Sequence, residues 1–443
     1  MNAILPNSEK PVGFNVIGLV SANAGLGISA RLMVQLLLSK GYPVAIYETD
    51  PGLGRGNHDK QLEKYTVESP DDLPYQINFY AYDPPGLSWV LSADGRPLIR
   101  PDSFNVAFSM WEVTALPTVL RQTLEMFDVV VAGSDYIRST FQRNLSNVFT
   151  LYAPHPVYIP QNVQADRERF GLPKDKTVFM CSFEPHSDPV RKNPFAVIEA
   201  FRRSLWDDPR AFLVLKLNNA NAGGTFHPVV RDLLDRCAQN PRVRIITDNL
   251  SYDEVLSLYA SADVYVSLHR AEGLGLGLME AMALGKPVIA TAWSGNMSYM
   301  NHTNSCLVGY KLIPVRGSIL VYTQDYLQTE CFWADPDIDQ AARWMKCMVE
   351  DPNLRVELGR QAATDMGHYQ KEAQEGRFIH EILEIWKHRE FLGQNKDKAA
   401  ALRSVRNAVY DQQHSYVERV TKRVRDQLDR RILWRFRKEL PAS

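Results

Sequence analysis

One pattern occurs twice along this chain of 443 residues, and this repetition most limits the folds that it can adopt. Short apolar segments typical of strands alternate with segments of helical period, first over residues 14–143 and again over residues 177–291. A stretch rich in proline and polar residues, 154–173, separates the two series. Such alternation indicates parallel sheets flanked by helices, so we predict an α/β protein with two Rossmann-like domains facing a cleft.

The length also favours more than one hydrophobic core. We predict an N-terminal Rossmann-like domain over residues 1–165, a second over residues 166–370, a helix over 371–395 and a helical tail over 396–443. Residues 310–335 interrupt the alternation with aromatic, irregular sequence, which we interpret as an inserted hairpin. The expected strands are 14–20, 43–47, 77–80, 105–110, 128–132, 177–182, 211–217, 243–247, 264–268 and 288–291, and the expected helices are 28–39, 117–127, 136–143, 194–204, 229–239, 252–261, 337–350, 352–366 and 369–387.

A glycine-rich turn follows the strand that ends near His269, and it carries two glutamates, Glu272 and Glu280. Gly273 and Gly275 allow a ligand to approach the backbone, and the helix start leaves N–H groups free for an anion. Glu280 lies two helical turns beyond Glu272 and can accept hydrogen bonds from vicinal hydroxyls, as in a ribose. Two acids around amides that bind phosphate favour a nucleotide-sugar, although a Gly-rich turn with two solvated glutamates is the simpler alternative.

Stretch 272–280 resembles the donor-site signature of family four retaining glycosyltransferases (glycosyl transferases group 1), which have the GT-B fold. The resemblance covers roughly residues 12–390 and is most specific at 191–194 and 265–296. It implies that Glu272 lies near the transferred sugar, that Glu280 holds the donor ribose, and that helix 369–387 crosses back to the first domain. Bacterial members mostly build lipopolysaccharide, exopolysaccharide or cell-wall glycans.

A pair of cations, Arg191 and Lys192, lies between the first strand and the first helix of the second half. Two cations there would point into the cleft and neutralise a departing diphosphate, whereas an ordinary surface loop is the alternative. By resemblance, Lys192 is the phosphate-binding lysine and Arg191 assists it. The family's usual Gly-Arg at the strand end is absent, and 182–184 reads Ser-Phe-Glu instead.

A second glycine-rich loop, Gly25-Leu26-Gly27, follows the first strand. With Ala30 it fits a weak dinucleotide fingerprint, and Glu48 ends the next strand, so an NAD(P)-dependent enzyme is the alternative function. That alternative leaves residues 272–280 unexplained. The resemblance implies instead that this loop closes the cleft beside the donor phosphate and the acceptor.

Further candidates follow strand ends. Trp111 is a candidate to stack on an acceptor sugar and Glu112 to orient an acceptor hydroxyl; a buried Trp and a helix-capping Glu are equally good interpretations. Relatives carry a histidine in this region, and the chain does not. The resemblance also assigns donor contacts to two loops, comprising Asn249, Leu250, Ser294, Gly295 and Asn296.

No cofactor is expected besides the nucleotide-sugar co-substrate, and GT-B enzymes need no bound metal at the diphosphate. Asp335 and Asp337 resemble a metal-binding pair, but an acidic first helical turn explains them better. His155, His186 and His227 have no partner at ligand spacing and are interpreted as loop histidines. The five cysteines are scattered, which favours buried thiols in a cytoplasmic protein.

The tail over residues 398–440 carries twelve Lys and Arg against five Asp and Glu, with apolar residues at helical spacing. An anionic membrane surface and a second copy of the chain are alternative partners for such a helix, and packing on its own domain is a third alternative.

The near-neutral charge of the whole chain gives no case for nucleic acid as a partner. We therefore predict a metal-independent hexosyltransferase of polysaccharide or lipopolysaccharide biosynthesis, peripheral at the inner face of the plasma membrane, with a noncatalytic scaffold as a further alternative.

Overall fold

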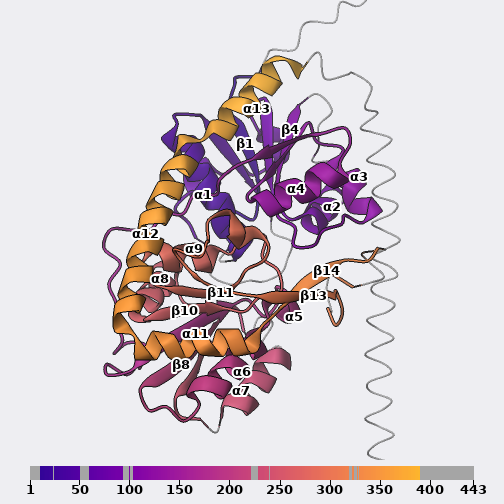
Figure 1. Cartoon of the computed structure of the whole chain (residues 1–443). Coiled ribbons are helices and arrows are strands. Elements are labelled where there is room, and N and C mark those ends of the chain that lie inside the picture. Colours follow the sequence, from indigo (N-terminus) through magenta and orange to yellow (C-terminus); the bar gives the residue numbers. More distant parts are fainter. Residues whose placement is uncertain are drawn as a thin grey trace, which may run out of the picture.

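The structure is a computed structural model that describes residues 10–22, 24–49, 59–92, 99, 103–220, 228–238, 240–318, 322–323, 327 and 329–389. Two six-stranded sheets form the centres of two α/β domains, stacked one above the other in Figure 1. All strand pairs within the two sheets are parallel. This is the two-domain GT-B architecture expected from the repeated alternation of strands and helices.

The first sheet has the strand order β2-β1-β3-β4-β5-β6. The four central strands β1, β3, β4 and β5 are buried on both faces, as parallel strands covered by helices should be. The strands are β1 (Phe14–Gly18), β2 (Val44–Glu48), β3 (Ile77–Ala81), β4 (Phe104–Ser109), β5 (Val129–Ala132) and β6 (Phe149–Tyr152), and the helices are α1 (Gly25–Ser39), α2 (Pro84–Ser92), α3 (Thr118–Leu124) and α4 (Asp135–Asn144), with short 3-10 turns η1 (Glu63–Tyr65) and η2 (Pro70–Asp72).

The second sheet has the order β12-β11-β10-β7-β8-β9. Its strands are β7 (Thr177–Phe183), β8 (Ala211–Leu217), β9 (Val243–Ile246), β10 (Val264–Ser267), β11 (Val288–Thr291) and β12 (Cys306–Val308). Its connections are α5 (Pro189–Lys192), α6 (Pro194–Leu205), α7 (Pro228–Cys237), α8 (Tyr252–Ser261), α9 (Leu276–Ala283) and the 3-10 turn η4 (Gly295–Ser298), with α11 (Ile338–Glu350) packed against α6.

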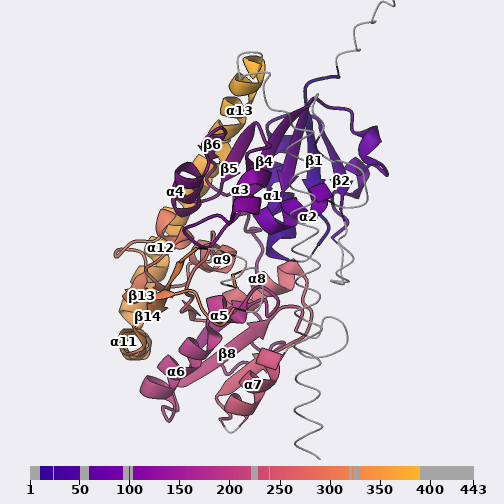
Figure 2. The same ribbon diagram turned by 90° about the vertical axis from the view of Figure 1, so that its right-hand side faces the viewer.

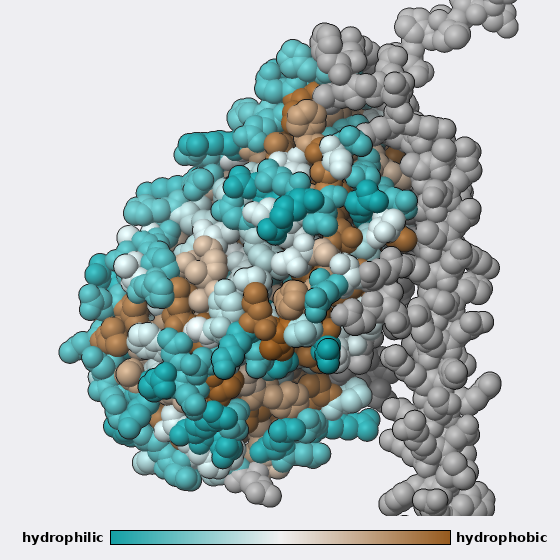
Figure 3. Space-filling view, turned by 45° about the vertical axis from the view of Figure 1, so that its right-hand side comes forward, coloured by the Kyte–Doolittle hydropathy of each residue, from teal (hydrophilic) through white to brown (hydrophobic). Residues whose placement is uncertain are grey.

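The irregular sequence after β12 does form a hairpin, as predicted. Strands β13 (Tyr310–Pro314) and β14 (Phe332–Pro336) pair antiparallel and project from the second domain. Leu312 on β13 is 51% exposed. Figure 3 shows brown apolar patches among the hydrophilic residues of one face of the molecule.

Two helices return the chain to the first domain. Helix α12 (Pro352–Glu375) leaves the second domain and α13 (Arg377–Lys387) lies along the first, an arrangement that both views show (Figures 1 and 2). Gly376, at φ 66°, makes the turn between them. Tyr369 on α12 fastens this connection, because its hydroxyl accepts a 3.0 Å hydrogen bond from the His155 backbone N–H in the segment that joins the two sheets.

The sequence-based elements agree closely with the structure, with a few omissions. Helix α2 was not predicted; it begins with two prolines, which are well tolerated in a first helical turn. Strands β6 and β12 and the short helix α5 were also missed, and α12 runs nine residues further than the predicted 352–366.

No helix among the described residues is long and apolar enough to span a membrane. The basic tail over residues 398–440, and with it the choice among its alternative partners, lies outside the described residues, as do His227 and Asn23.

Gly359 lies at a close contact between α12 and the turn after α9. A Cβ at this position would lie 2.2 Å from the Gly285 carbonyl oxygen, which is backbone and cannot rotate away. Gly367, two turns further along the same helix, has open space around it.

We predict that Gly359→Ala destabilises the protein by about 1–3 kcal/mol, because overpacking against backbone outweighs the helix propensity of alanine. Gly367→Ala should instead stabilise by roughly 0.5–1 kcal/mol. Denaturant unfolding of both variants measures this. Equal stability of the two variants would contradict the close approach of α12 to the turn after α9.

Candidate active site

A cleft of about 630 Å³ lies between the two domains. Its walls come from the carboxyl ends of strands in both sheets, the position where open α/β sheets bind ligands. The sequence-predicted residues that line it are Arg191, Lys192, Asn249, Leu250, Glu272, Gly273, Leu274, Gly275, Glu280, Gly25, Leu26 and Glu112.

The backbone of the Glu272 turn is held from behind by the loop after β11. Ser294 Oγ accepts a 2.8 Å hydrogen bond from Glu272 N–H, and Gly295 N–H donates to Glu272 O at 2.8 Å. A Cβ on residue 295 would lie 2.0 Å from Gly273 O, so only glycine permits this contact. The loop thus fixes the direction of the Glu272 side chain.

Four charged side chains meet at the centre of the cleft. Lys192 Nζ lies 2.6 Å from Glu272 Oε1, and Arg191 Nη1 lies 3.5 Å from Glu272 Oε2 and 3.6 Å from Glu112 Oε1. Burial alone would raise the pKa of Glu272, but the charges of Lys192 and Arg191 outweigh it and lower this pKa to about 2. Glu272 is therefore a buried carboxylate at neutral pH.

The short helix α5 that carries both cations is held in an unusual backbone conformation at each end. Asp188 has φ 56° and Asn193 has φ 52°, the left-handed region that costs energy for residues with a Cβ. Side chains offset this cost. The Asp188 carboxylate accepts hydrogen bonds from the N–H groups of Val190 and Arg191, and Asn193 donates to Leu268 O. Such strain is typical of functional sites.

Glu280 on α9 is 4% exposed, and its carboxyl accepts a 2.8 Å hydrogen bond from the Tyr252 hydroxyl. Burial raises the pKa of Glu280 to about 7, against the lowering effect of this hydrogen bond. Asn249 and Leu250 line the same cleft. The two signature glutamates thus occupy the same cleft in opposite electrostatic environments.

The first glycine-rich loop faces the same cleft. Gly25 and Leu26 line it, whereas Gly27 packs against the β1 end, where a Cβ would lie 2.1 Å from Ala22 O. Glu48, the acid of the dinucleotide alternative, accepts a 2.8 Å hydrogen bond from the Ser21 backbone N–H.

The structure bears on three of the predicted roles. Trp111 is fully buried and donates to Ala115 O, so it is a core residue and presents no face to a sugar. Ser294 and Gly295 support the Glu272 turn, Asn296 donates a hydrogen bond to Thr291 O, and none of these three residues lines the cleft. Arg191 is 3% exposed and also donates to Ala271 O at 2.9 Å, so it orients carboxylates and backbone from beneath the surface.

Sequence reasoning missed several residues of the cleft. Tyr252, Tyr322, Lys216 and His186 all line it. Lys216, at the end of β8, is 1% exposed, and burial lowers its pKa to about 8. In the sequence, only Lys216 gave a signal of its role, because a lysine near the end of an otherwise apolar strand is unusual. There was no such signal for Tyr252, Tyr322 and His186, whose places in the cleft depend on chain segments that folding brings together.

Two other predicted assignments concern histidine and metal. His155 is fully buried, with its ring hydrogen-bonded to Ser29 and Pro156, and burial lowers its pKa to about 4. Asp337 caps α11 through the Gln340 N–H, and Asp335 pairs with Arg270 at 2.8 Å. Over the described part of the chain, no three His, Cys, Asp or Glu residues cluster as metal ligands would.

Comparison with known proteins agrees with this geometry. Residues 163–311 match the family model of the glycosyl transferases group 1. A GDP-mannose-dependent α-(1-6)-phosphatidylinositol monomannoside mannosyltransferase of Mycobacterium tuberculosis is 27% identical over 237 residues, which are 49% of this chain and 57% of that protein. A D-inositol 3-phosphate glycosyltransferase of Kineococcus radiotolerans is 28% identical over 191 residues, covering 40% and 42%. The chain thus spans about half the length of these relatives.

Solved structures share the fold at low identity. Sucrose-phosphate synthase from Thermosynechococcus elongatus superposes with a TM-score of 0.59 at 16% identity, covering 84% of this chain and all of that one. HepE from Anabaena, in complex with UDP and glucose, gives 0.59 at 14% identity over the same shares. The fold is therefore GT-B, and residues 163–311 are similar to the glycosyl transferases group 1 family.

The buried Glu280 should make folding stability depend on pH. Its pKa of about 7 in the folded state exceeds the usual value of 4.5, so its contribution to stability is present below pH 4.5 and is lost as the pH rises through about 7. We predict that Glu280→Gln raises the free energy of unfolding by about 2 kcal/mol at pH 8, and that this gain shrinks towards pH 5.

Denaturant unfolding at both pH values measures the effect, with Glu168→Gln, whose side chain is 86% exposed, as the control. A gain that is the same at pH 5 and pH 8 would show that Glu280 is already ionised without cost.

Proposed function

We propose that this protein is a retaining glycosyltransferase that moves a hexose from a nucleotide-diphosphate sugar to a glycan or glycolipid acceptor. The observation that carries the proposal is the convergence of Glu272, Glu280 and Lys192 in one interdomain cleft. Retention of configuration rests on the family resemblance alone. A role in polysaccharide or lipopolysaccharide biosynthesis is proposed because the curated relatives transfer sugars to lipid- or inositol-based acceptors by name.

Each charge has a role in this proposal. Glu280, as a carboxylate, accepts hydrogen bonds from the donor ribose, which replace the one from Tyr252 or add to it. Lys192 exchanges its contact with Glu272 for the donor diphosphate, because its side chain is 20% exposed and lines the cleft. Arg191 stays beneath and keeps Glu272 ionised and oriented towards the sugar, and Glu112 faces the acceptor side.

When the bond between the anomeric carbon and the diphosphate breaks, the electron pair goes to the diphosphate oxygen. The positive charge of Lys192 then stabilises the growing negative charge of the leaving group. The acceptor hydroxyl, oriented by Glu112, forms the new glycosidic bond with the anomeric carbon and gives its proton to the departing diphosphate oxygen. The dinucleotide alternative is less well supported, because Glu48 is already hydrogen-bonded to the backbone of the loop that would hold the cofactor.

A thermal-shift screen of UDP-, GDP- and ADP-sugars tests the function, since a donor that binds the folded state raises Tm. For the donor found, we predict that Lys192→Ala lowers kcat about 100-fold with little change in donor affinity, because the diphosphate gains charge in the transition state. Lys174→Ala, 79% exposed, is the matched control. If KM alone rises, Lys192 is a ground-state contact only. If NADH binds and no nucleotide-sugar does, the dinucleotide alternative replaces the proposal.

We also propose that the reaction needs no bound metal, because Lys192 and the N–H groups at the start of α9 are available to neutralise the diphosphate. Turnover should therefore change less than about twofold in excess EDTA. Complete loss that Mg²⁺ or Mn²⁺ restores would contradict this and direct attention to Asp335 and Asp337. A cytoplasmic location at a membrane, through residues 398–440, stays a prediction.

A further inference from the structure

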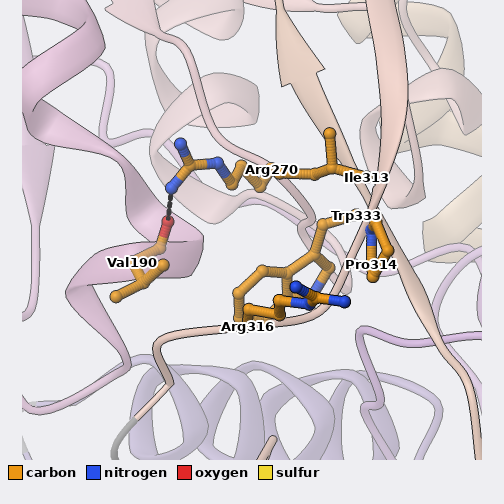
Figure 4. Close-up of a pocket in the computed structure, with 6 residues that line it drawn as sticks. All are labelled: Val190, Arg270, Ile313, Pro314, Arg316 and Trp333. Carbon is orange, nitrogen blue, oxygen red and sulfur yellow. Dashed lines mark hydrogen bonds between the residues drawn. The ribbon is translucent and has the colours of Figure 1, made fainter.

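The hairpin inserted after β12 contacts the helix that carries the two cations. Arg270 joins the two elements: it pairs with Asp335 on β14 and donates a 2.9 Å hydrogen bond to Val190 O on α5 (Figure 4). Ser318, from the segment between the two hairpin strands, donates to the buried Asp188 carboxylate that caps α5. An element outside both sheets therefore supports the strained helix from two directions.

A third contact reaches across the cleft to the first domain. Tyr322, from the same segment between β13 and β14, donates its hydroxyl to Glu112 Oε2, while Glu112 Oε1 faces Arg191 at 3.6 Å. Glu112 follows β4 in the first sheet, so this carboxylate is held by two groups that both belong to the second domain. Its position is thereby tied to α5 and to the hairpin.

The Tyr322 ring is fixed by its own neighbours. It packs against Trp111 and Trp333, with ring centroids 5.4 and 5.7 Å apart, and the Arg191 guanidinium lies 5.8 Å from its centroid. The side chain is only 6% exposed. Because this packing restricts the rotamers of Tyr322, its hydroxyl is held at one position, and little further side-chain entropy is lost when it hydrogen-bonds to Glu112.

Glu112 is held directly beside the signature turn. A Cβ on Gly273 would lie 3.4 Å from Glu112 Oε1, so the carboxylate contacts the backbone of the residue that follows Glu272. Arg191 lies between the two carboxylates and is close to both, at 3.5 and 3.6 Å. Without a second donor, Glu112 would be free to rotate towards Arg191 and weaken the hold of that arginine on Glu272.

We propose that Tyr322 is a positioning residue of the active site: it holds the Glu112 carboxylate beside the Glu272 turn and so keeps Arg191 shared between the two acids. The catalytic role of Tyr322 rests on the proposed glycosyl transfer. The Tyr322–Glu112 hydrogen bond, which ties the hairpin to the first domain, does not depend on that function. It gives the inserted hairpin a function in the reaction that neither the sheets nor the signature supplies.

The variant Tyr322→Phe isolates the hydroxyl, because phenylalanine keeps the ring between Trp111 and Trp333. Tyr310→Phe is the matched control, since Tyr310 belongs to the same hairpin, is 38% exposed and packs on Trp293 away from Glu112. Hydrogen–deuterium exchange needs no substrate. We expect faster exchange of the peptide around Glu112 in Tyr322→Phe, with unchanged exchange in Tyr310→Phe. Unchanged exchange in both variants would overturn the tie.

Turnover of the nucleotide-sugar found in the screen gives the second measurement. We expect Tyr322→Phe to lower kcat about tenfold with donor KM nearly unchanged, the size expected for one hydrogen bond to a charged group. Because Tyr322 acts through Glu112, the double variant Tyr322→Phe/Glu112→Gln should be no slower than Glu112→Gln alone.

Multiplied effects in the double variant would show that Tyr322 acts independently of Glu112, which overturns its role as a positioning residue. If the wild-type protein consumes no nucleotide-sugar, the proposed function fails, and the exchange result alone then upholds or overturns the tie between the hairpin and the first domain.

Discussion

The ionic contact of Glu272 with Lys192 and Arg191 is the interaction on which the rest of the site depends. Glu272 is 8% exposed and would lose its charge if it were buried alone, because removing a carboxylate from water is costly. Two cations at 2.6 and 3.5 Å reverse that preference. Presenting these cations also strains the backbone, because Asp188 and Asn193, at the two ends of α5, have positive φ angles although both carry a Cβ.

The supports of α5 come from distant parts of the chain. The turn after β10 supplies Leu268 O, which accepts from Asn193, and Arg270, which donates to Val190 O, while the segment between the hairpin strands supplies Ser318. Such over-determination is what allows a strained segment to persist. It also leaves one cation flexible: Lys192 keeps a partly exposed ammonium above the fixed guanidinium of Arg191 and is the group able to change partners when an anion enters.

The two signature glutamates show how one fold sets two charge states. Glu272 lies among cations and ionises easily, whereas Glu280 meets only a hydroxyl and has a pKa raised to about 7 by burial. Their spacing of eight residues was readable from the sequence, but the contrast between them was not. It depends on Tyr252, which belongs to a different helix, and on the cations of α5.

The sequence by itself determined the two parallel sheets, the hairpin and the membership of Glu272, Glu280 and Lys192 in one cleft. Strand and helix periods are local, and parallel sheets bring their strand ends together by construction. Only the tertiary structure decided that Trp111 is core, that Ser294 supports the turn from behind, and that Tyr322 reaches Glu112. Those outcomes depend on side-chain burial and on contacts between segments up to 210 residues apart, which no local pattern records.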